Sequence, residues 1–170
     1  NAVNRFIHNT IHGKDANLYE VKTPLIFMEG YNTFDMSEGN INYDNSSEVV
    51  IREDLGVQED DKGVKVRTLR VQDEFEDIHP DWNENWEGKI KIVDANDPSN
   101  VTKYKSVIND LWSDFKSHPR GSAKRKIALQ EVQSYQSAYA KVDLAYAITS
   151  HKSQGSTYNT AILTVLSNCA

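Results

Sequence analysis

The sequence predicts an α/β chain that carries a small antiparallel β-barrel and an antiparallel helical hairpin. Three observations lead to this fold class. Short strand-like segments separated by turn residues fill positions 21–94. Two apolar stripes at helical spacing fill positions 95–141. Nearly continuous apolar runs at 142–149 and 160–165 are typical of strands in a buried parallel sheet.

The first residues predict an amphipathic helix. Helical spacing is found at Val3, Phe6, Ile7, Thr10 and Ile11. Gly13 follows as a stop signal, so we expect one face of this helix to pack on a sheet. His8 and His12 lie four positions apart, a spacing that a metal site can use. Because Asn9 stands where a zinc-protease helix carries Glu, we expect two partly exposed histidines and no metal.

Five segments read as short strands: 25–28, 39–43, 48–53, 64–72 and 89–93. Five strands in so short a stretch predict a small antiparallel barrel over residues 21–94. The ranges 53–61 and 73–87 are rich in acidic residues but lack the spacing of a calcium loop. We expect them to be solvated loops that repel DNA.

Charge divides the chain. The net charge is −6 overall, yet residues 21–98 carry 19 acidic and 8 basic residues, whereas residues 99–141 carry 3 acidic and 8 basic ones. This asymmetry predicts two structural units with different partners.

A helical hairpin is predicted over residues 95–141. Asp97 or Ser99 caps the first helix, and Pro98 stands early in it. The first stripe consists of Val101, Tyr104, Ile108, Leu111, Trp112 and Phe115. After a break at 118–122, the second consists of Ile127, Leu129, Val132, Tyr135, Tyr139 and Val142. The basic residues at the turn are either a phosphate or partner contact or a solvated tip: Arg120, Lys124, Arg125 and Lys126.

Cys169 is the only cysteine, which fits a reducing compartment such as the cytoplasm, or a host cell's cytoplasm for a viral protein. No apolar run reaches the roughly 20 residues of a membrane span, so we expect no membrane partner. Because the chain opens on Asn1 rather than Met, we expect a piece of a longer protein.

The stretch 145–158 carries the most chemical information. An apolar run leads into a segment rich in hydroxyl and amide side chains, with Lys152 and Gly155 within it. Hydroxyls, backbone N–H groups and a lysine are suited to phosphate oxygens, and glycine lets a backbone approach closely. The alternative is a polar turn between two core strands.

The run His-Lys-Ser-Gln-Gly at 151–155, with its preceding hydroxyls, resembles motif V of superfamily 1 helicases of the RecD-like and phage Dda-like branch. The opening Asn-Ala-Val-Asn is similar to the segment that precedes the inserted domain in Dda-like enzymes. The segments 89–94 and 112–115 stand where Dda-like counterparts are expected.

The resemblance implies a fold. Residues 1–20 and 142–170 would be part of the second RecA-like domain, of the P-loop NTPase type. An SH3-like barrel (21–94) and the hairpin (95–141) would be inserted into it. Thr149, Ser150 and His151 would face DNA phosphates, while Lys152 and Gln154 would support that contact or the interdomain cleft. The residues near the nucleotide would be Gly155, Ser156 and Thr157, the last standing where many relatives carry a ribose-binding Glu.

The resemblance also implies a function: the C-terminal part of an ATP-dependent DNA helicase, of 5′-to-3′ polarity. Its partners would be single-stranded DNA and the first RecA-like domain. This sequence has no Gly-x-x-x-x-Gly-Lys-Ser/Thr loop to cradle phosphates, and no Asp-Glu pair on an apolar strand to bind magnesium. We therefore expect no catalytic residue here, with ATP and Mg²⁺ used only by the parent enzyme. The alternatives are a stand-alone module that binds protein or nucleic acid without nucleotide chemistry, and a degraded helicase remnant retained for structure.

Overall fold

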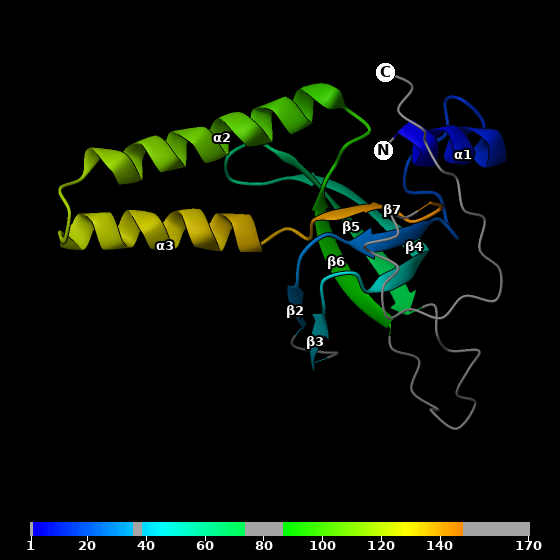
Figure 1. Cartoon of the computed structure of the whole chain (residues 1–170), viewed down its shortest axis with the longest axis horizontal. Coiled ribbons are helices and arrows are strands. Elements are labelled where there is room, and N and C mark those ends of the chain that lie inside the picture. Colours follow the sequence, from blue (N-terminus) through cyan, green and yellow to red (C-terminus); the bar gives the residue numbers. More distant parts are fainter. Residues whose placement is uncertain (1, 36–38, 74–86, 148–170) are drawn as a thin grey trace, which may run out of the picture.

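The computed structural model describes residues 2–35, 39–73 and 87–147 (Figure 1). A helix, six strands, two helices and a final strand follow one another in these residues. Their bounds are α1 Ala2–His12, β1 Pro24–Phe27, β2 Tyr31–Asp35, β3 Gly39–Tyr43, β4 Glu48–Glu59, β5 Lys65–Asp73, β6 Glu87–Val93, α2 Pro98–Ser117, α3 Ala123–Ser137 and β7 Val142–Leu144. The α2–α3 hairpin projects from one end of the sheet, and α1 lies at the opposite end.

Five strands form one antiparallel sheet in the order β6-β5-β4-β1-β7, and β2 pairs with β3 in a separate two-stranded sheet. The long β4–β5 pair changes register between Ile51 and Glu53 and again between Asp54 and Val57. Gly56, inside the second irregularity, has φ +96°, a conformation that an L side chain rarely adopts. These bulges bend the sheet around its core.

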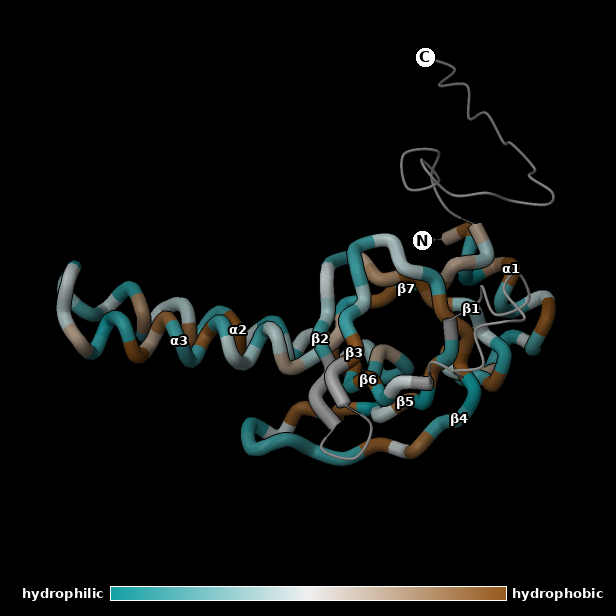
Figure 2. The backbone as a smooth tube through the Cα atoms, turned by 90° about the horizontal axis from the view of Figure 1, so that it is seen from below, coloured by the Kyte–Doolittle hydropathy of each residue, from teal (hydrophilic) through white to brown (hydrophobic). Residues whose placement is uncertain are grey.

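The predicted antiparallel β structure is confirmed, but no closed barrel is found among the described strands. The strands curve around a common interior (Figure 2). β6 and β7 remain the two edges of the five-stranded sheet. A backbone hydrogen bond from Ala140 N to the carbonyl oxygen of Lys91, at 2.7 Å, links the segment before β7 to β6.

The interior is apolar and spans both sheets. Phe27 of β1 and Tyr43 of β3 stack face to face, with ring centroids 4.5 Å apart and planes 8° from parallel. This contact joins the β2–β3 pair to the main sheet, and aromatic pairs of this kind add to the free energy gained by burial. The buried members of this core are Tyr19, Leu25, Phe27, Tyr31, Tyr43, Val49, Ile51, Leu69, Val71, Ile90, Ile92, Ala140 and Leu144.

Three strands differ from the sequence-based expectation. β2 was not predicted, and β4 continues through residues expected to be an acidic loop, so that prediction is wrong up to Glu59. β7 pairs antiparallel with β1, opposing Leu144 to Leu25, so the prediction of a parallel strand is wrong for 142–144. Positions 74–86 and 160–165 lie outside the described residues.

Helix α1 has the predicted extent, and Gly13 ends it with φ +99°. Its orientation is opposite to the prediction. Val3, Phe6 and Ile11 are 53%, 72% and 59% exposed, whereas Asn4 and His8 are buried. The apolar stripe faces solvent in this structure because the buried polar side chains find hydrogen-bond partners on the sheet side, as described below.

The hairpin forms as predicted. Asp97 caps α2 by accepting a hydrogen bond from Ser99 N at 2.9 Å, and Ser122 caps α3 by accepting one from Arg125 N at 3.2 Å. The buried side chains of α3 are Ala128, Val132 and Tyr135. The predicted second stripe is therefore wrong at Ile127, which is 63% exposed, and Tyr139 and Val142 follow the helix rather than belonging to it.

None of the helices described above has both the length and the apolar character needed to cross a membrane.

Candidate functional site

The phosphate-binding segment predicted from sequence lies outside the described residues. This applies to Thr149, Ser150, His151, Lys152, Gln154, Gly155, Ser156 and Thr157. The structure does describe the chain that leads to them, from β7 to residue 147. We call residues 144–147 the strand exit. Its contacts with α1 form the candidate site.

Asn4 of α1 binds the strand exit through both ends of its side-chain amide. Its Nδ2 donates to the carbonyl oxygen of Leu144 at 2.5 Å, and its Oδ1 accepts from the backbone N–H of Ala147 at 2.5 Å. The side chain is 2% exposed. Because a buried polar group without a partner costs about 1–3 kcal/mol, this double contact stabilises both the helix side chain and the strand backbone.

Tyr146 adds a second contact between the strand exit and α1. Its hydroxyl lies 3.3 Å from His8 Nδ1 and 3.0 Å from His12 Nε2. His8 Nε2 lies 3.0 Å from the carbonyl oxygen of Asn17, which can only accept, so His8 carries its proton on Nε2. His8 Nδ1 then accepts from Tyr146, and His12 Nε2 donates to the Tyr146 oxygen.

Together, Asn4, His8 and His12 form a clamp that holds the strand exit from one side. Their spacing of four residues puts them on one face of α1, which explains why this polar face is turned inward. Sequence reasoning assigned no role to Asn4, although the resembling Asn-Ala-Val-Asn segment contains it. The signal available in the sequence was the run of Asn4, His8 and His12 at helical spacing.

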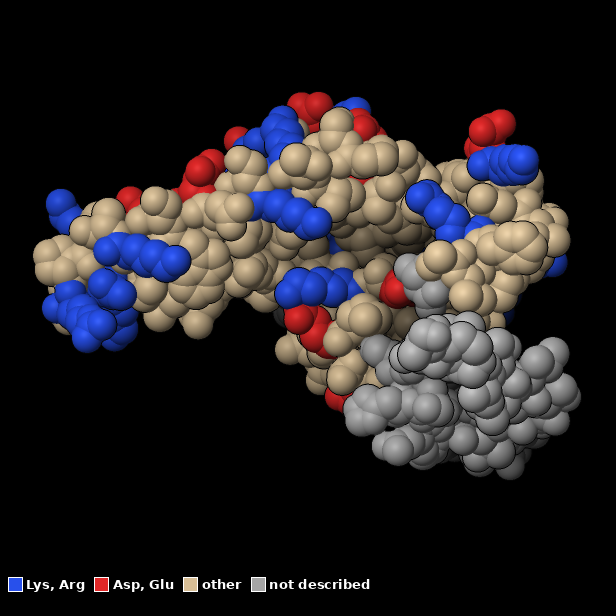
Figure 3. Space-filling model, turned by 45° about the horizontal axis from the view of Figure 1, so that its top comes forward, with Lys and Arg blue, Asp and Glu red and all other residues tan. Residues whose placement is uncertain are grey.

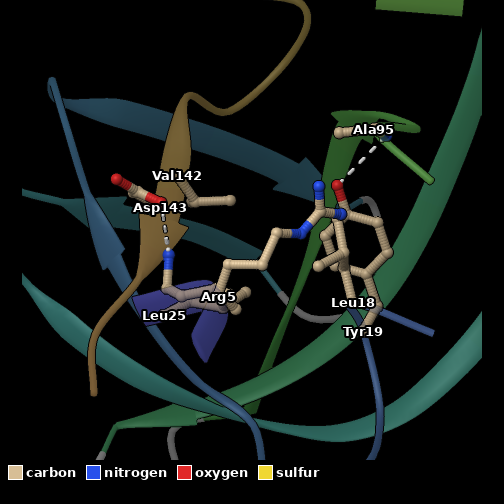
Figure 4. Close-up of a pocket in the computed structure, with 8 residues that line it drawn as sticks. Arg5, Leu18, Tyr19, Leu25, Ala95, Val142 and Asp143 are labelled. Carbon is tan, nitrogen blue, oxygen red and sulfur yellow. Dashed lines mark hydrogen bonds between the residues drawn. The ribbon is translucent and has the colours of Figure 1, made fainter. Parts of the chain in front are cut away.

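A pocket of about 220 Å³ opens between α1 and the sheet beside β7 (Figure 4). Arg5 extends across it toward Tyr19. Burial raises the pKa of Tyr19, whose hydroxyl accepts a hydrogen bond from Ala95 N at 3.2 Å. Apart from Asp143, the remaining lining is aliphatic, so the pocket presents one guanidinium, one phenol and one carboxylate residue beside an apolar wall.

The base of the hairpin is attached to the sheet through Asp60, in the turn between β4 and β5. Its Oδ2 accepts from the hydroxyls of Tyr135 and Tyr139 at 2.7 and 2.8 Å, and its Oδ1 accepts from the backbone N–H groups of Lys62 and Val64. We call Asp60, Tyr135 and Tyr139 the hairpin latch. Asp60 was expected to be a solvated loop residue; it is instead an acceptor that joins two units.

The latch changes the proton affinity of its members. Burial alone would raise the pKa of Asp60, but the four hydrogen bonds that its carboxylate accepts outweigh burial and hold the pKa below its usual value. Burial and the neighbouring Asp60 carboxylate raise the pKa of both tyrosines. Each shift favours the charge state in which the hydroxyls donate to a carboxylate.

The four basic residues predicted as a contact lie around the free end of the hairpin, where lysine and arginine side chains gather (Figure 3). Arg120, Lys124 and Lys126 are exposed. Arg125 differs from them, because its guanidinium donates to the carbonyl oxygen of His118 at 2.8 Å and lies 4.3 Å from the ring centroid of Phe115. Arg125 therefore holds the turn together.

Of the two histidines of α1, His12 is partly exposed as predicted, whereas His8 is not. His8 is fully buried rather than partly exposed, and the rings of His8 and His12 lie 4.7 Å apart. Within residues 2–35, 39–73 and 87–147, no group of three or more His, Cys, Asp or Glu side chains is arranged to hold a metal ion.

Comparison with known proteins adds no family assignment: neither a scan against protein-family models nor a search of curated proteins found a match to this chain.

Proposed function

We propose that this chain belongs to an ATP-dependent DNA helicase of superfamily 1, with 5′-to-3′ polarity. Residues 149–154 would bind the single-stranded DNA backbone, and the sheet and hairpin would couple motion mechanically. One observation carries the proposal: Ala147, whose N–H is bound by Asn4 of α1, is followed two residues later by the hydroxyls Thr149 and Ser150 and then by the motif-V-like run at 151–155. The N-terminal segment that is similar to Dda-like enzymes is thus hydrogen-bonded to the residues that precede the motif-V-like run.

The proposed role of residues 149–154 requires that the chain leading to them be held in place. A phosphate-binding group contributes fully only when it is held close to its productive position. Asn4 of α1 binds the backbone of Leu144 and Ala147, and the hydroxyl of Tyr146 contacts His12. These three groups hold the backbone in place up to residue 147. This attachment supports the assignment of Thr149, Ser150 and His151 to the DNA phosphates, with Lys152 and Gln154 behind them.

Mechanical coupling is supported by the hairpin latch and by charge. Asp60 joins the turn between β4 and β5 to Tyr135 of α3 and to Tyr139, which follows α3, so the hairpin is attached to the sheet at two hydroxyls. Residues 21–98 carry a net charge of −11, which disfavours contact with a phosphate backbone. An acidic unit that is attached to the hairpin is better suited to transmitting force than to moving along DNA.

The proposal is tested in the full-length gene product. Thr149→Ala and His151→Ala should each weaken single-stranded DNA binding and reduce the DNA stimulation of ATP hydrolysis. The matched control is Thr102→Ala, which removes an exposed hydroxyl on α2 and should change neither quantity. Unaltered affinity and unaltered stimulation in both motif variants would contradict the assignment.

The reading frame offers a second test. A helicase requires a Gly-x-x-x-x-Gly-Lys-Ser/Thr loop, which we expect upstream of Asn1 in the same frame. Its absence from the gene, together with no ATP hydrolysis by the gene product, would favour the stand-alone binding module.

A further inference from the structure

We propose that the free end of the hairpin is a second DNA contact, which binds the phosphate backbone at a place separate from residues 149–154. The contact consists of Lys116, Arg120, Lys124 and Lys126, which we call the basic tip. This inference rests on the proposed function for the identity of the polymer, DNA, but on different residues.

The basic tip has no acidic counterpart. Residues 115–130 contain five basic residues and no Asp or Glu. In the part of the chain that the structure describes, none of the four tip side chains forms an ion pair, and all four are exposed. The nearest acid in sequence, Asp114, lies 3.4 Å from His118 instead. The tip is therefore a concentration of unneutralised positive charge.

Two of these charges stand at an unfavourable place. Lys124 and Lys126 lie in the first turn of α3, which contains no acidic residue. The positive end of a helix dipole disfavours a cation there by about 0.3–1 kcal/mol. Because the exposed side chains of Lys124 and Lys126 make no compensating contact in the described structure, the hairpin would be more stable with neutral residues at these positions. A polyanion that neutralises them would offset this cost.

The chemistry of the tip favours a phosphate backbone over base edges. Long, flexible, exposed cations neutralise phosphates and release counterions, which is a sequence-independent interaction. Phe115, near the end of α2, has the Arg125 guanidinium 4.3 Å from its ring centroid and the Trp112 ring 5.5 Å away, so its neighbours already contact the ring. The tip should therefore bind DNA without sequence preference and with a strong dependence on salt.

The position of the tip separates it from the strand exit. The 20 residues of α2 span about 30 Å, and α1 with its clamp lies at the end of the sheet opposite to the hairpin. A reach of about 30 Å corresponds to about nine base pairs at 3.4 Å each. The tip would therefore contact a stretch of DNA other than the one that residues 149–154 would hold.

The test compares two triple variants that lose the same charge. The tip variant is Arg120→Gln, Lys124→Gln, Lys126→Gln. The control is Lys14→Gln, Lys22→Gln, Lys105→Gln, three exposed lysines away from the tip. Binding to fluorescently labelled single-stranded and duplex oligonucleotides is measured by anisotropy between about 50 and 200 mM salt.

We expect the tip variant to lose affinity at least about tenfold at low salt, while the control stays within about twofold. The slope of log K against log salt should fall by about 2–3, since each lost phosphate contact contributes about 0.7–0.9. Thermal unfolding is measured in parallel. The tip variant should melt at the same or a higher temperature, because two cations leave the start of α3. Weaker binding is then not a consequence of misfolding.

Several outcomes overturn the inference. Equal losses in the tip and control variants would show a response to net charge alone. Unchanged affinity in the tip variant would show that the basic tip does not bind DNA. An acidic protein surface would then be the next candidate for its partner. The motif variants keep the two proposals apart. If Thr149→Ala and His151→Ala lose binding but the tip variant does not, this inference fails alone. If only the tip variant loses binding, the motif assignment fails and the tip stands.

Discussion

Asn4 Oδ1 accepts a hydrogen bond from the backbone N–H of Ala147 at 2.5 Å, across a sequence separation of 143 residues. The contact joins the first helix to the residues directly after β7. It also explains why α1 turns a polar face toward the sheet. A hydrophobic residue at position 4 could not satisfy the two backbone groups that the asparagine serves.

Asn4→Ala should lower the free energy of unfolding by about 3 kcal/mol. The substitution leaves the buried Leu144 carbonyl and the partly buried Ala147 N–H without their partner, and a buried group in this state costs about 1–3 kcal/mol. Urea unfolding measures the change. Hydrogen exchange at Ala147 should accelerate along with it, since its N–H loses its acceptor.

The matched control for Asn4→Ala is Asn9→Ala. Asn9 lies on the same helix and is only half-buried, and its side chain makes none of the contacts with the strand exit. We expect a change within about 0.5 kcal/mol, as at ordinary surface sites. Equal effects of the two substitutions would mean that the clamp does not stabilise the fold.

The hairpin latch should make stability depend on pH. The pKa of Asp60 is lowered in the folded protein, so its carboxylate stabilises the fold fully above about pH 4, the ordinary Asp value. That stabilisation is lost as the pH falls through the lowered pKa. Asp60→Asn should cost about 2 kcal/mol at pH 7 and progressively less as the pH is lowered below about 4, measured by urea unfolding across this pH range.

Asp61→Asn is the control for the latch, because Asp61 is the adjacent acid and is exposed. Its substitution should leave the pH dependence of unfolding unchanged. A wild-type-like pH profile in Asp60→Asn would show that the two tyrosine hydroxyls do not stabilise the attachment of the hairpin.

Arg67 connects two carboxylates at the margin of the core. Its guanidinium pairs with Asp54 and, at 3.3 Å, with Asp94, and it lies 5.3 Å from the ring centroid of Tyr19. The Arg67 and Asp94 side chains are 11% and 8% exposed. Arg67→Met should therefore lower the free energy of unfolding by about 3 kcal/mol, because it leaves a buried carboxylate without its cation.

Arg70→Met provides the comparison on the same strand. Arg70 pairs with Glu53 at 3.2 Å, but both side chains are far more exposed, and exposed pairs contribute about 0–1 kcal/mol. Both variants are measured by urea unfolding at pH 7. If Arg70→Met were as destabilising as Arg67→Met, burial would not be the quantity that decides the effect.

Local signals in the sequence predicted most of the elements. Asp97 and Pro98 marked the start of α2, Gly13 marked the end of α1, and alternation located β5 and β6. These features depend on neighbours a few residues away, so a single sequence carries them. β2 was missed because its five residues, Tyr31–Asp35, do not alternate clearly between apolar and polar.

Long-range relations were not predictable in the same way. The apolar stripe of α1 indicated a helix, but it did not indicate which face meets this sheet. That depended on Asn4 finding Leu144 and Ala147. The apolar run at 142–149 was typical of a parallel strand, yet 142–144 form an antiparallel edge strand because β1 offers its free side there. For the candidate site, the phosphate-binding role of residues 149–154 stays a prediction outside the described residues, and the clamp was not predicted.

The latch at the root of the hairpin has a mechanical meaning. A transverse load on the far end of α2 acts at the root with a lever arm of about 30 Å. A small transverse force at the far end of α2 therefore produces a large torque at the turn between β4 and β5. The two tyrosine hydroxyls on Asp60 sit where that torque is greatest, so they would be among the first bonds to yield if the arm were overloaded.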